Sequence, residues 1–250
     1  MLTKQIKFKA HKLITQDKSL HPVPGRYLIP EWYKNIKGDL KPSSIRSMNI
    51  KHCKPFLDTL MAGYLIKNPI DQIINFNVPN PNKDNKLDTW ININSQIQEN
   101  PFVKIINLNR GHEVHPLEQI GGESCPYAKT NKMWAIYKIL NPWTIDIPKG
   151  YSVLFTPPLN RPNDNLEILS GIVDSGHPAP TNFPCVFKKE GTWLLEKGTP
   201  IATVFPFKIE NWKMTIEEQD NEKRLKEQFS FFTKIFKHYH KFNWVKKSWK

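Results

Sequence analysis

Short apolar runs separated by turn-forming residues dominate the chain between residues 102 and 207. These runs are rich in β-branched and aromatic residues, and Gly, Pro, Asn and Asp divide them at intervals of about 8 to 15 residues. The segments 70–78 and 90–97 have the same alternating character, with the period of two that is typical of half-buried strands. The pattern therefore predicts a mainly β fold, built as a barrel or a sandwich.

Two segments have helical rather than strand periodicity. The first begins at Pro55, has apolar residues at helical spacing and reaches Gly63, which predicts a short helix near 55–62. The second, 216–242, has aromatic and aliphatic residues three and four apart, with acidic residues at its start and lysines near its end. We expect an amphipathic C-terminal helix there, packed on the β body or on a neighbouring subunit.

The N-terminal segment is divided by closely spaced prolines, which preclude a long helix. We expect an extended Pro-rich arm, fixed to the body by its aromatic and aliphatic residues, namely Tyr27, Ile29, Trp32 and Tyr33. The predicted organisation is an arm over 1–54, a β-rich core domain over 55–210, and a C-terminal helix with a basic tail over 211–250.

The net charge of +13 suggests a nucleic-acid-binding protein until its source is examined. Only five of the 36 basic residues are Arg, the residue that binds phosphates bidentately, and the excess lies at the two ends of the chain. This distribution argues against nucleic acid as a partner. No apolar run approaches the roughly 18 residues of a membrane helix, and three distant cysteines suit a reducing compartment, so we expect a cytoplasmic protein.

One cluster of potential metal ligands stands out, composed of His112, His115 and Glu118. Histidines at i and i+3 point to opposite faces of a strand, so only a loop or a helical turn would bring them together. Pro116 and the Gly121–Gly122 pair indicate a loop at this place. The cluster is therefore a candidate for a divalent metal, and surface or loop-capping histidines are the alternative; the sequence names no other cofactor.

The segment 145–207 resembles the β-clip core of the dUTPase and dCTP deaminase superfamily. Pro148, Gly150 and Tyr151 match the family's P-x-G-Y motif, Gly171-Ile172-Val173-Asp174 is similar to its G-V-I-D strand, and Lys197-Gly198 followed by Ile201-Ala202 resembles its last motif. The resemblance implies a β-clip-like barrel or sandwich. It also implies a catalytic role for Asp174, which corresponds to the aspartate that orients the attacking water in dUTPases.

The sequence departs from this family at the positions that bind the nucleotide. Pro158-Leu159 replaces the phosphate-binding Arg-Ser pair, and His177 stands where the family has a tyrosine that stacks on the sugar. A triphosphate needs several cationic or N–H donors, and the family's usual ones are missing. The whole chain also resembles a family of proteins from tailed phages of marine bacteria and proteobacteria, which implies a phage origin and a place in the host cytoplasm, without any particular activity.

Two functional hypotheses follow. The first is a phage-type accessory protein that uses a dUTPase-like β-clip scaffold without hydrolysis, as a binding or assembly module, and forms a homodimer or homotrimer that protects its sheet edges. The second is an enzyme with a rearranged Asp/His pocket, acting on a nucleotide or another small polar substrate with or without a divalent metal. Its catalytic residues would be Asp174 and His177.

The segment 141–160 is the predicted lining of any site, because Thr156 and the residues after it leave a strand as a Pro-rich loop. We expect Asn160 and Arg161 to bind substrate or partner at this rim, together with Tyr151. The family resemblance places Asp174 and His177 opposite them. A well-packed hairpin and its exit loop are the structural alternative.

Overall fold

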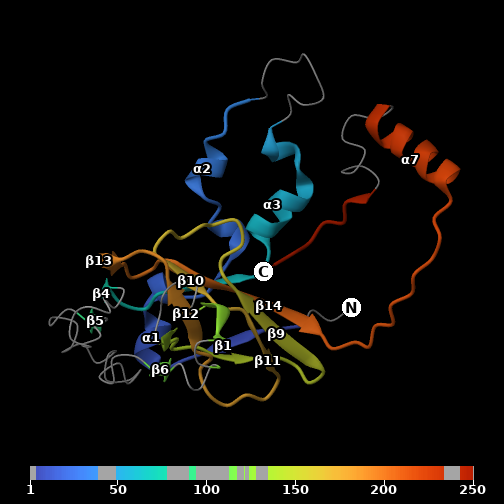
Figure 1. The fold of residues 1–250 in the computed structure, drawn as a ribbon. Helices are drawn as coiled ribbons and strands as arrows, with labels where there is room; N and C mark the ends of the chain where they lie inside the picture. The colour runs from blue at the N-terminus through green and yellow to red at the C-terminus, as the bar shows by residue number, and fades with distance from the viewer. Residues whose placement is uncertain are drawn as a thin grey trace. The chain divides into compact units, whose positions relative to one another are not determined.

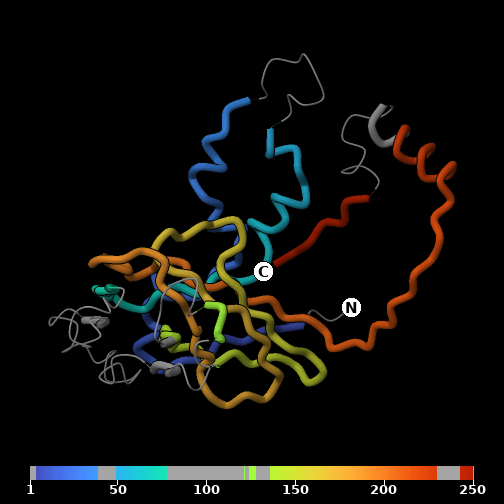
Figure 2. Tube along the Cα trace, viewed as in Figure 1, coloured from blue at the N-terminus to red at the C-terminus, as the bar shows by residue number. Residues whose placement is uncertain are grey.

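The computed structural model describes residues 4–38, 49–77, 90–93, 113–116, 121, 124–127, 135–233 and 243–249 (Figures 1 and 2). The fold is mainly β, as the alternating pattern predicts, and each strand pair whose register the structure describes is antiparallel. The chain divides into two compact units. One comprises residues 1–23 and 63–208 and holds the β body; the other comprises residues 24–62 and 209–250.

A five-stranded sheet forms the central part of the β body. Its order is β11-β9-β14-β3-β2, so that β11 is an edge strand and β14 lies between two partners that are distant in sequence. The strands are β11 (Gly171–Asp174), β9 (Tyr151–Thr156), β14 (Pro200–Lys208), β3 (Tyr64–Lys67) and β2 (Val23–Pro24). Figure 1 shows β9, β11 and β14 running side by side.

The described residues also form three smaller sheets. A four-stranded sheet has the order β10-β12-β7-β6, a three-stranded sheet the order β13-β4-β5, and a two-stranded sheet pairs β1 with β8. Their strands are β10 (Leu166–Ile168), β12 (Phe183–Phe187), β7 (Ala135–Ile139), β6 (Glu113–Pro116), β13 (Gly191–Leu195), β4 (Gln72–Phe76), β5 (Trp90–Ile93), β1 (Lys7–Lys9) and β8 (Thr144–Asp146).

The core lies between the inner faces of these sheets. Phe155 of β9 meets Phe183 of β12 edge to face, with 5.3 Å between the ring centroids, and both rings are buried. Phe187 in turn meets Trp193 edge to face, with 5.6 Å between the ring centroids. Aromatic pairs of this kind contribute about 0.5–1.5 kcal/mol each beyond the burial of their area, so they hold the separate sheets together as one body.

A buried asparagine connects strands that are far apart in sequence. Asn68, which follows β3, is fully buried; its side-chain amide donates to the carbonyls of Ile70, Leu195 (3.0 Å) and Glu196 (3.2 Å). Its side-chain oxygen accepts from Gln72 Nε2 at 2.8 Å. Because the buried polar groups satisfy one another, the turn before β14 is fixed against the start of β4.

The N-terminal segment differs from the extended arm that its prolines suggest. It contains helices of only three to five residues instead. Such short helices fit between the prolines, which would interrupt a longer helix. Tyr33 is buried, whereas Tyr27 and Trp32 are 63% and 47% exposed. The elements are α1 (Lys12–Gln16), η1 (Lys18–Leu20), η2 (Gly25–Tyr27) and α2 (Glu31–Lys34), followed after residue 48 by η4 (Ile50–His52).

The short helix predicted near 55–62 is confirmed as α3 (Lys54–Met61), with Pro55 in its first turn. Gly63 follows the last turn with a φ of 67°, a left-handed conformation that glycine adopts without strain. A Cβ there would also lie 2.7 Å from the ring of Phe205. Gly63 therefore permits both the end of the helix and the close approach of β14.

The C-terminal helix begins later than its apolar spacing predicts. α7 spans Asn221–Thr233, and residues 234–242 lie outside the described part of the chain. The side chain of Asp220 accepts from the backbone N–H groups of Glu222 and Lys223 at 3.0 and 3.1 Å, and this N-cap sets the start of the helix. Residues 209–220 form no helix or strand, and Leu225 and Phe229 on α7 are 57% and 61% exposed.

The segment around His115 is a strand where we expected a loop. β6 pairs with β7, with His115 opposite Ile136 and Pro116 opposite Ala135. Pro116 is tolerated because it is the last residue of an edge strand. Among the helices that the structure describes, none is long and apolar enough to cross a membrane.

Candidate functional site

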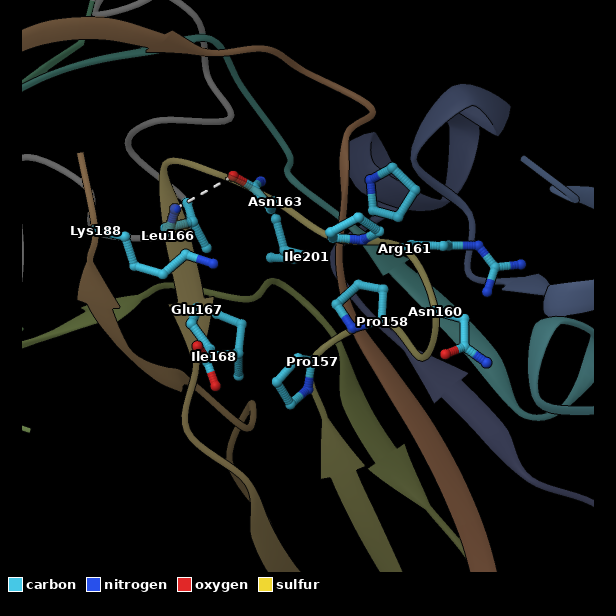
Figure 3. A pocket seen from close by; sticks show the side chains of 12 residues that line it. Pro157, Pro158, Asn160, Arg161, Asn163, Leu166, Glu167, Ile168, Lys188 and Ile201 are labelled. Atoms are coloured by element: carbon cyan, nitrogen blue, oxygen red, sulfur yellow. Dashed lines mark hydrogen bonds between the residues drawn. The ribbon is translucent and has the colours of Figure 1, made fainter. Parts of the chain in front are cut away.

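A pocket of about 340 Å³ lies where the loop after β9 passes from the five-stranded to the four-stranded sheet (Figure 3). The loop, residues 157–163, begins directly after Thr156 and ends before β10. The start of β14 lies beside it, because Thr203 is the register partner of Thr156. The pocket is thus formed by three segments of the β body that the sheet pairing brings together.

Proline rings and aliphatic side chains make up most of the pocket wall. Polar groups occupy the rim, where they offer both charges and amides. The apolar lining residues are Pro157, Pro158, Pro162, Leu166, Ile168, Pro200 and Ile201, and the polar ones are Asn160, Arg161, Asn163, Glu167 and Lys188. This combination of an apolar wall with a few polar groups is typical of ligand pockets.

The loop is held in shape by its own hydrogen bonds. Asn163 Oδ1 accepts from the backbone N–H groups of Asn165 (2.9 Å) and Leu166 (3.2 Å), and Arg161 Nη1 donates to the carbonyl of Leu159 at 3.1 Å. Asn160 has a φ of 55°, a left-handed conformation that asparagine tolerates better than most residues. The loop therefore presents the pocket wall in a defined conformation.

The rim carries two cations and one carboxylate. Partial burial lowers the pKa of Arg161 from its ordinary 12.5, but a guanidinium stays charged at neutral pH. Figure 3 shows the Lys188 side chain reaching over Glu167 and Ile168 at one end, while Arg161 extends toward the other end. Nothing in the sequence pattern marks Lys188 or Glu167 as pocket residues, since they join the site only through the pairing of β10 with β12.

The structure brings together only part of the predicted site. Asn160 and Arg161 line the pocket, as expected for the rim of the Pro-rich loop. Asp174 is the register partner of Ser152, near the start of β9, whereas the pocket loop follows the end of that strand. The four residue-to-residue steps from Ser152 to Thr156 span about 13 Å. The expectation that Asp174 and His177 face Asn160 and Arg161 is therefore wrong, because antiparallel pairing places them at opposite ends of β9.

Asp174 has a defined environment of its own. The Ser152 hydroxyl, which is buried, donates to Asp174 Oδ1 at 2.6 Å, and Asp174 itself is exposed. His177 is exposed in the connection that follows β11. Tyr151 lies at the same end of β9, with the Lys4 ammonium 4.6 Å above its ring. These three predicted residues therefore belong to one end of the sheet, away from the pocket.

The predicted metal ligands lie mostly outside the part of the chain that the structure describes. His112 and Glu118 lie outside the described residues, and of His115 only the backbone position in β6 is described. Within the described ranges, no three or more His, Cys, Asp or Glu side chains are grouped so that they could hold a metal ion.

Comparisons with known proteins find similarity only among solved structures. No protein-family model matches the chain, and no curated protein matches it. Four structure chains match, including a dUTPase variant of Staphylococcus bacteriophage 80alpha with dUpNHpp, at 13% identity over 88% of this chain and 91% of that chain, with a TM-score of 0.34. Another is a dUTPase variant from phage phi11 of S. aureus, whose structure is described as coordinating a structural Mg(II) ion. It is 15% identical over 34% of this chain and 72% of that chain, with a TM-score of 0.24. These matches name the family that residues 145–207 resemble, but at such TM-scores the likeness carries no argument about this chain.

Proposed function

We propose that the protein is a phage-type accessory protein whose dUTPase-like β-clip scaffold acts as a non-hydrolytic binding and assembly module. The observation that carries the proposal is the composition of the pocket after β9. Pro158 and Leu159 stand where the resembled family has its phosphate-binding pair, and the wall that includes Pro158 is formed by proline and aliphatic residues. Such a wall suits an apolar group far better than a triphosphate, which needs convergent charged or N–H donors.

In this proposal the binding partner is a protein, and a second copy of the same chain is one such partner. The five-stranded sheet ends at β11, whose Ile172 is 63% exposed, and edge strands that expose apolar side chains favour pairing or covering by another chain. A homodimer or homotrimer would cover such surfaces. Asn160 and Arg161 contribute the polar contacts at the pocket rim.

A second candidate function rests on the Ser152–Asp174 hydrogen bond. A carboxylate that is oriented by a buried hydroxyl and exposed at a strand end can position a water molecule, and His177 follows it by three residues. In this alternative the protein is an enzyme that acts on a nucleotide or another small polar substrate at the Asp174 end of the sheet, with or without a divalent metal.

Two measurements on the full chain test the proposal. Incubation with a panel of nucleoside triphosphates and Mg²⁺ is expected to release no pyrophosphate above the protein-free blank. Pyrophosphate release that disappears in Asp174→Asn and persists in Glu167→Gln would establish the enzyme instead.

Light scattering over a micromolar concentration series is expected to give a dimer or trimer. Combining Asn160→Gly, which suits the positive φ, with Arg161→Ala is expected to weaken association. Its cost in stability is expected to be about 1 kcal/mol, because the half-buried Arg161 loses its hydrogen bond to the Leu159 carbonyl, so Tm should fall by only a few degrees. A strictly monomeric wild-type chain would refute the assembly role.

A further inference from the structure

An exposed apolar stripe follows β14. Residues 209–220 form no helix or strand, and within them Trp212, Met214 and Ile216 are 88%, 82% and 89% exposed. These three residues are spaced two apart, so wherever the segment is extended their side chains share one face. Large apolar side chains gathered in this way usually mark an interaction surface.

We propose that Trp212 of one chain inserts into the proline-walled pocket of a second copy. The inference rests on the proposed assembly function and names its contact: the pocket after β9 is the receptor, and residues 209–220, which we call the C-terminal arm, are the ligand. The site is complete only when the second copy supplies the indole.

The pocket suits an indole in size and in chemistry. Its volume of about 340 Å³ falls in the range of small ligand sites, and proline rings and aliphatic groups offer flat apolar surfaces for an aromatic ring. A tryptophan buries about 150–250 Å² and requires an acceptor for its N–H group. The Glu167 carboxylate at the pocket wall provides an acceptor of this kind.

The charges of the two surfaces are complementary. The C-terminal arm has four acidic residues, Glu210, Glu217, Glu218 and Asp220, against the single basic residue Lys213. The pocket lining has Arg161 and Lys188 against Glu167. Glu210 lies two residues before Trp212 and shares its face in an extended chain, so it can meet Lys188 when the indole is inserted. Complementary charge favours contact between the arm and the pocket over contact between two acidic arms, which repel each other.

Chain length identifies the occupant as a second copy. The pocket contacts the start of β14 at Ile201, whereas the arm leaves the end of that strand at Lys208, about 23 Å away along the strand. Trp212 lies only four residue-to-residue steps beyond Lys208, which is at most about 14 Å of extended chain. A reversal of direction would itself use two or more of those residues. Trp212 therefore cannot return to the pocket of its own chain.

Substitution of the indole gives the first test. Trp212→Ala is expected to raise the dissociation constant of the oligomer at least about tenfold by light scattering or sedimentation, as loss of a buried aromatic anchor usually does. Phe229→Ala removes an aromatic side chain that is 61% exposed on α7 and is expected to leave the constant unchanged. Equal effects of the two substitutions, or none for Trp212→Ala, would overturn the inference.

A charge exchange tests the predicted orientation. Lys188→Glu is expected to weaken association, and Glu210→Lys in the same chain is expected to restore it. Lys189→Glu, the neighbouring exposed lysine, serves as the control for a general change of charge. Weakening by Lys188→Glu that Glu210→Lys does not relieve would contradict the proposed contact.

Cross-linking distinguishes failure of this contact from failure of the assembly function. A photoreactive phenylalanine at position 212, in a re-equilibrated mixture of ¹⁵N-labelled and unlabelled chains, is expected to yield peptides that join 212 of one isotope to 157–168 or 188 of the other. Cross-links to another surface of the second copy would refute the pocket contact and leave the assembly function standing. Cross-links only within one chain would refute the contact, and a monomeric wild-type chain would refute both.

Discussion

The buried Ser152 hydroxyl donates a 2.6 Å hydrogen bond to the Asp174 carboxylate across the pair formed by β9 and β11. This bond gives the edge strand a fixed polar contact at its end. It also orients the carboxylate on which the enzyme alternative depends.

Removing that hydroxyl should weaken the edge strand slightly. Ser152→Ala is expected to lower the free energy of unfolding by about 1 kcal/mol, the usual net contribution of one hydrogen bond. Urea denaturation measures the change, and Ser170→Ala, at an exposed site near the same strand, is the control. A loss no larger than that of the control would show that the bond contributes nothing to stability.

The Asp17–Lys197 ion pair should make stability depend on pH in the acid range. Lys197 Nζ lies 2.7 Å from Asp17 Oδ2, and this hydrogen bond, with a further one from Ser19, holds the pKa of Asp17 at about 2 against an ordinary value of 3.8. Since the folded pKa is the lower one, the stabilisation is present above about pH 4 and is lost as the pH falls toward 2.

Asp17→Asn keeps an N-cap acceptor for Ser19 but removes the charge. We expect it to cost under about 1 kcal/mol at pH 7, because the pair is partly exposed, and to converge with the wild type near pH 2. Asp164→Asn, at an exposed carboxylate, is the control for charge alone. A difference between Asp17→Asn and wild type that stays constant from pH 7 to 2 would contradict the assignment.

The buried amide of Asn68 should be a major determinant of stability. Asn68→Ala leaves the Gln72 amide and the carbonyls of Leu195 and Glu196 without their buried partner, and is expected to cost at least about 2 kcal/mol. Asn211→Ala, at an exposed position, is the matched control in chemical denaturation. Similar midpoints for the two variants would refute this role.

Gly171 should resist even the smallest side chain. A Cβ at this position would lie 2.5 Å from Cζ of the buried Phe155. Gly171→Ala is therefore expected to cost about 1–3 kcal/mol by overpacking. Gly38→Ala is the control, because nothing lies within 4 Å of a Cβ built at that position. Thermal unfolding measures both variants, and a Gly171→Ala variant with the wild-type Tm would refute the predicted clash.

The sequence predicts most strands of the β body because each apolar run has its own period and its own turn residues. YSVLF and TWLLE, for example, coincide with β9 and β13. β3 was missed, since Tyr64–Lys67 is a run too short to show a period. β6 was missed because Pro116 and the nearby glycines suggest a loop when the partner strand is unknown.

The candidate site was predictable only where it depends on local sequence. The Pro-rich loop with Asn160 and Arg161 could be recognised from its residues. The position of Asp174 relative to the pocket could not be predicted, because it depends on the register between β9 and β11. The spacing of residues along the chain does not determine how two strands are aligned. Lys188 became a pocket residue through strand pairing in the same way.

The place of β14 inside the five-stranded sheet also governs the order in which the body can form during synthesis. β3 and β9 both pair with β14, and both leave the ribosome well before it does. Until residues 200–208 emerge, the two strands lack their common neighbour and present open edges. Such long-range closure makes folding slow, so the nascent chain is most exposed to aggregation just before the last strand arrives.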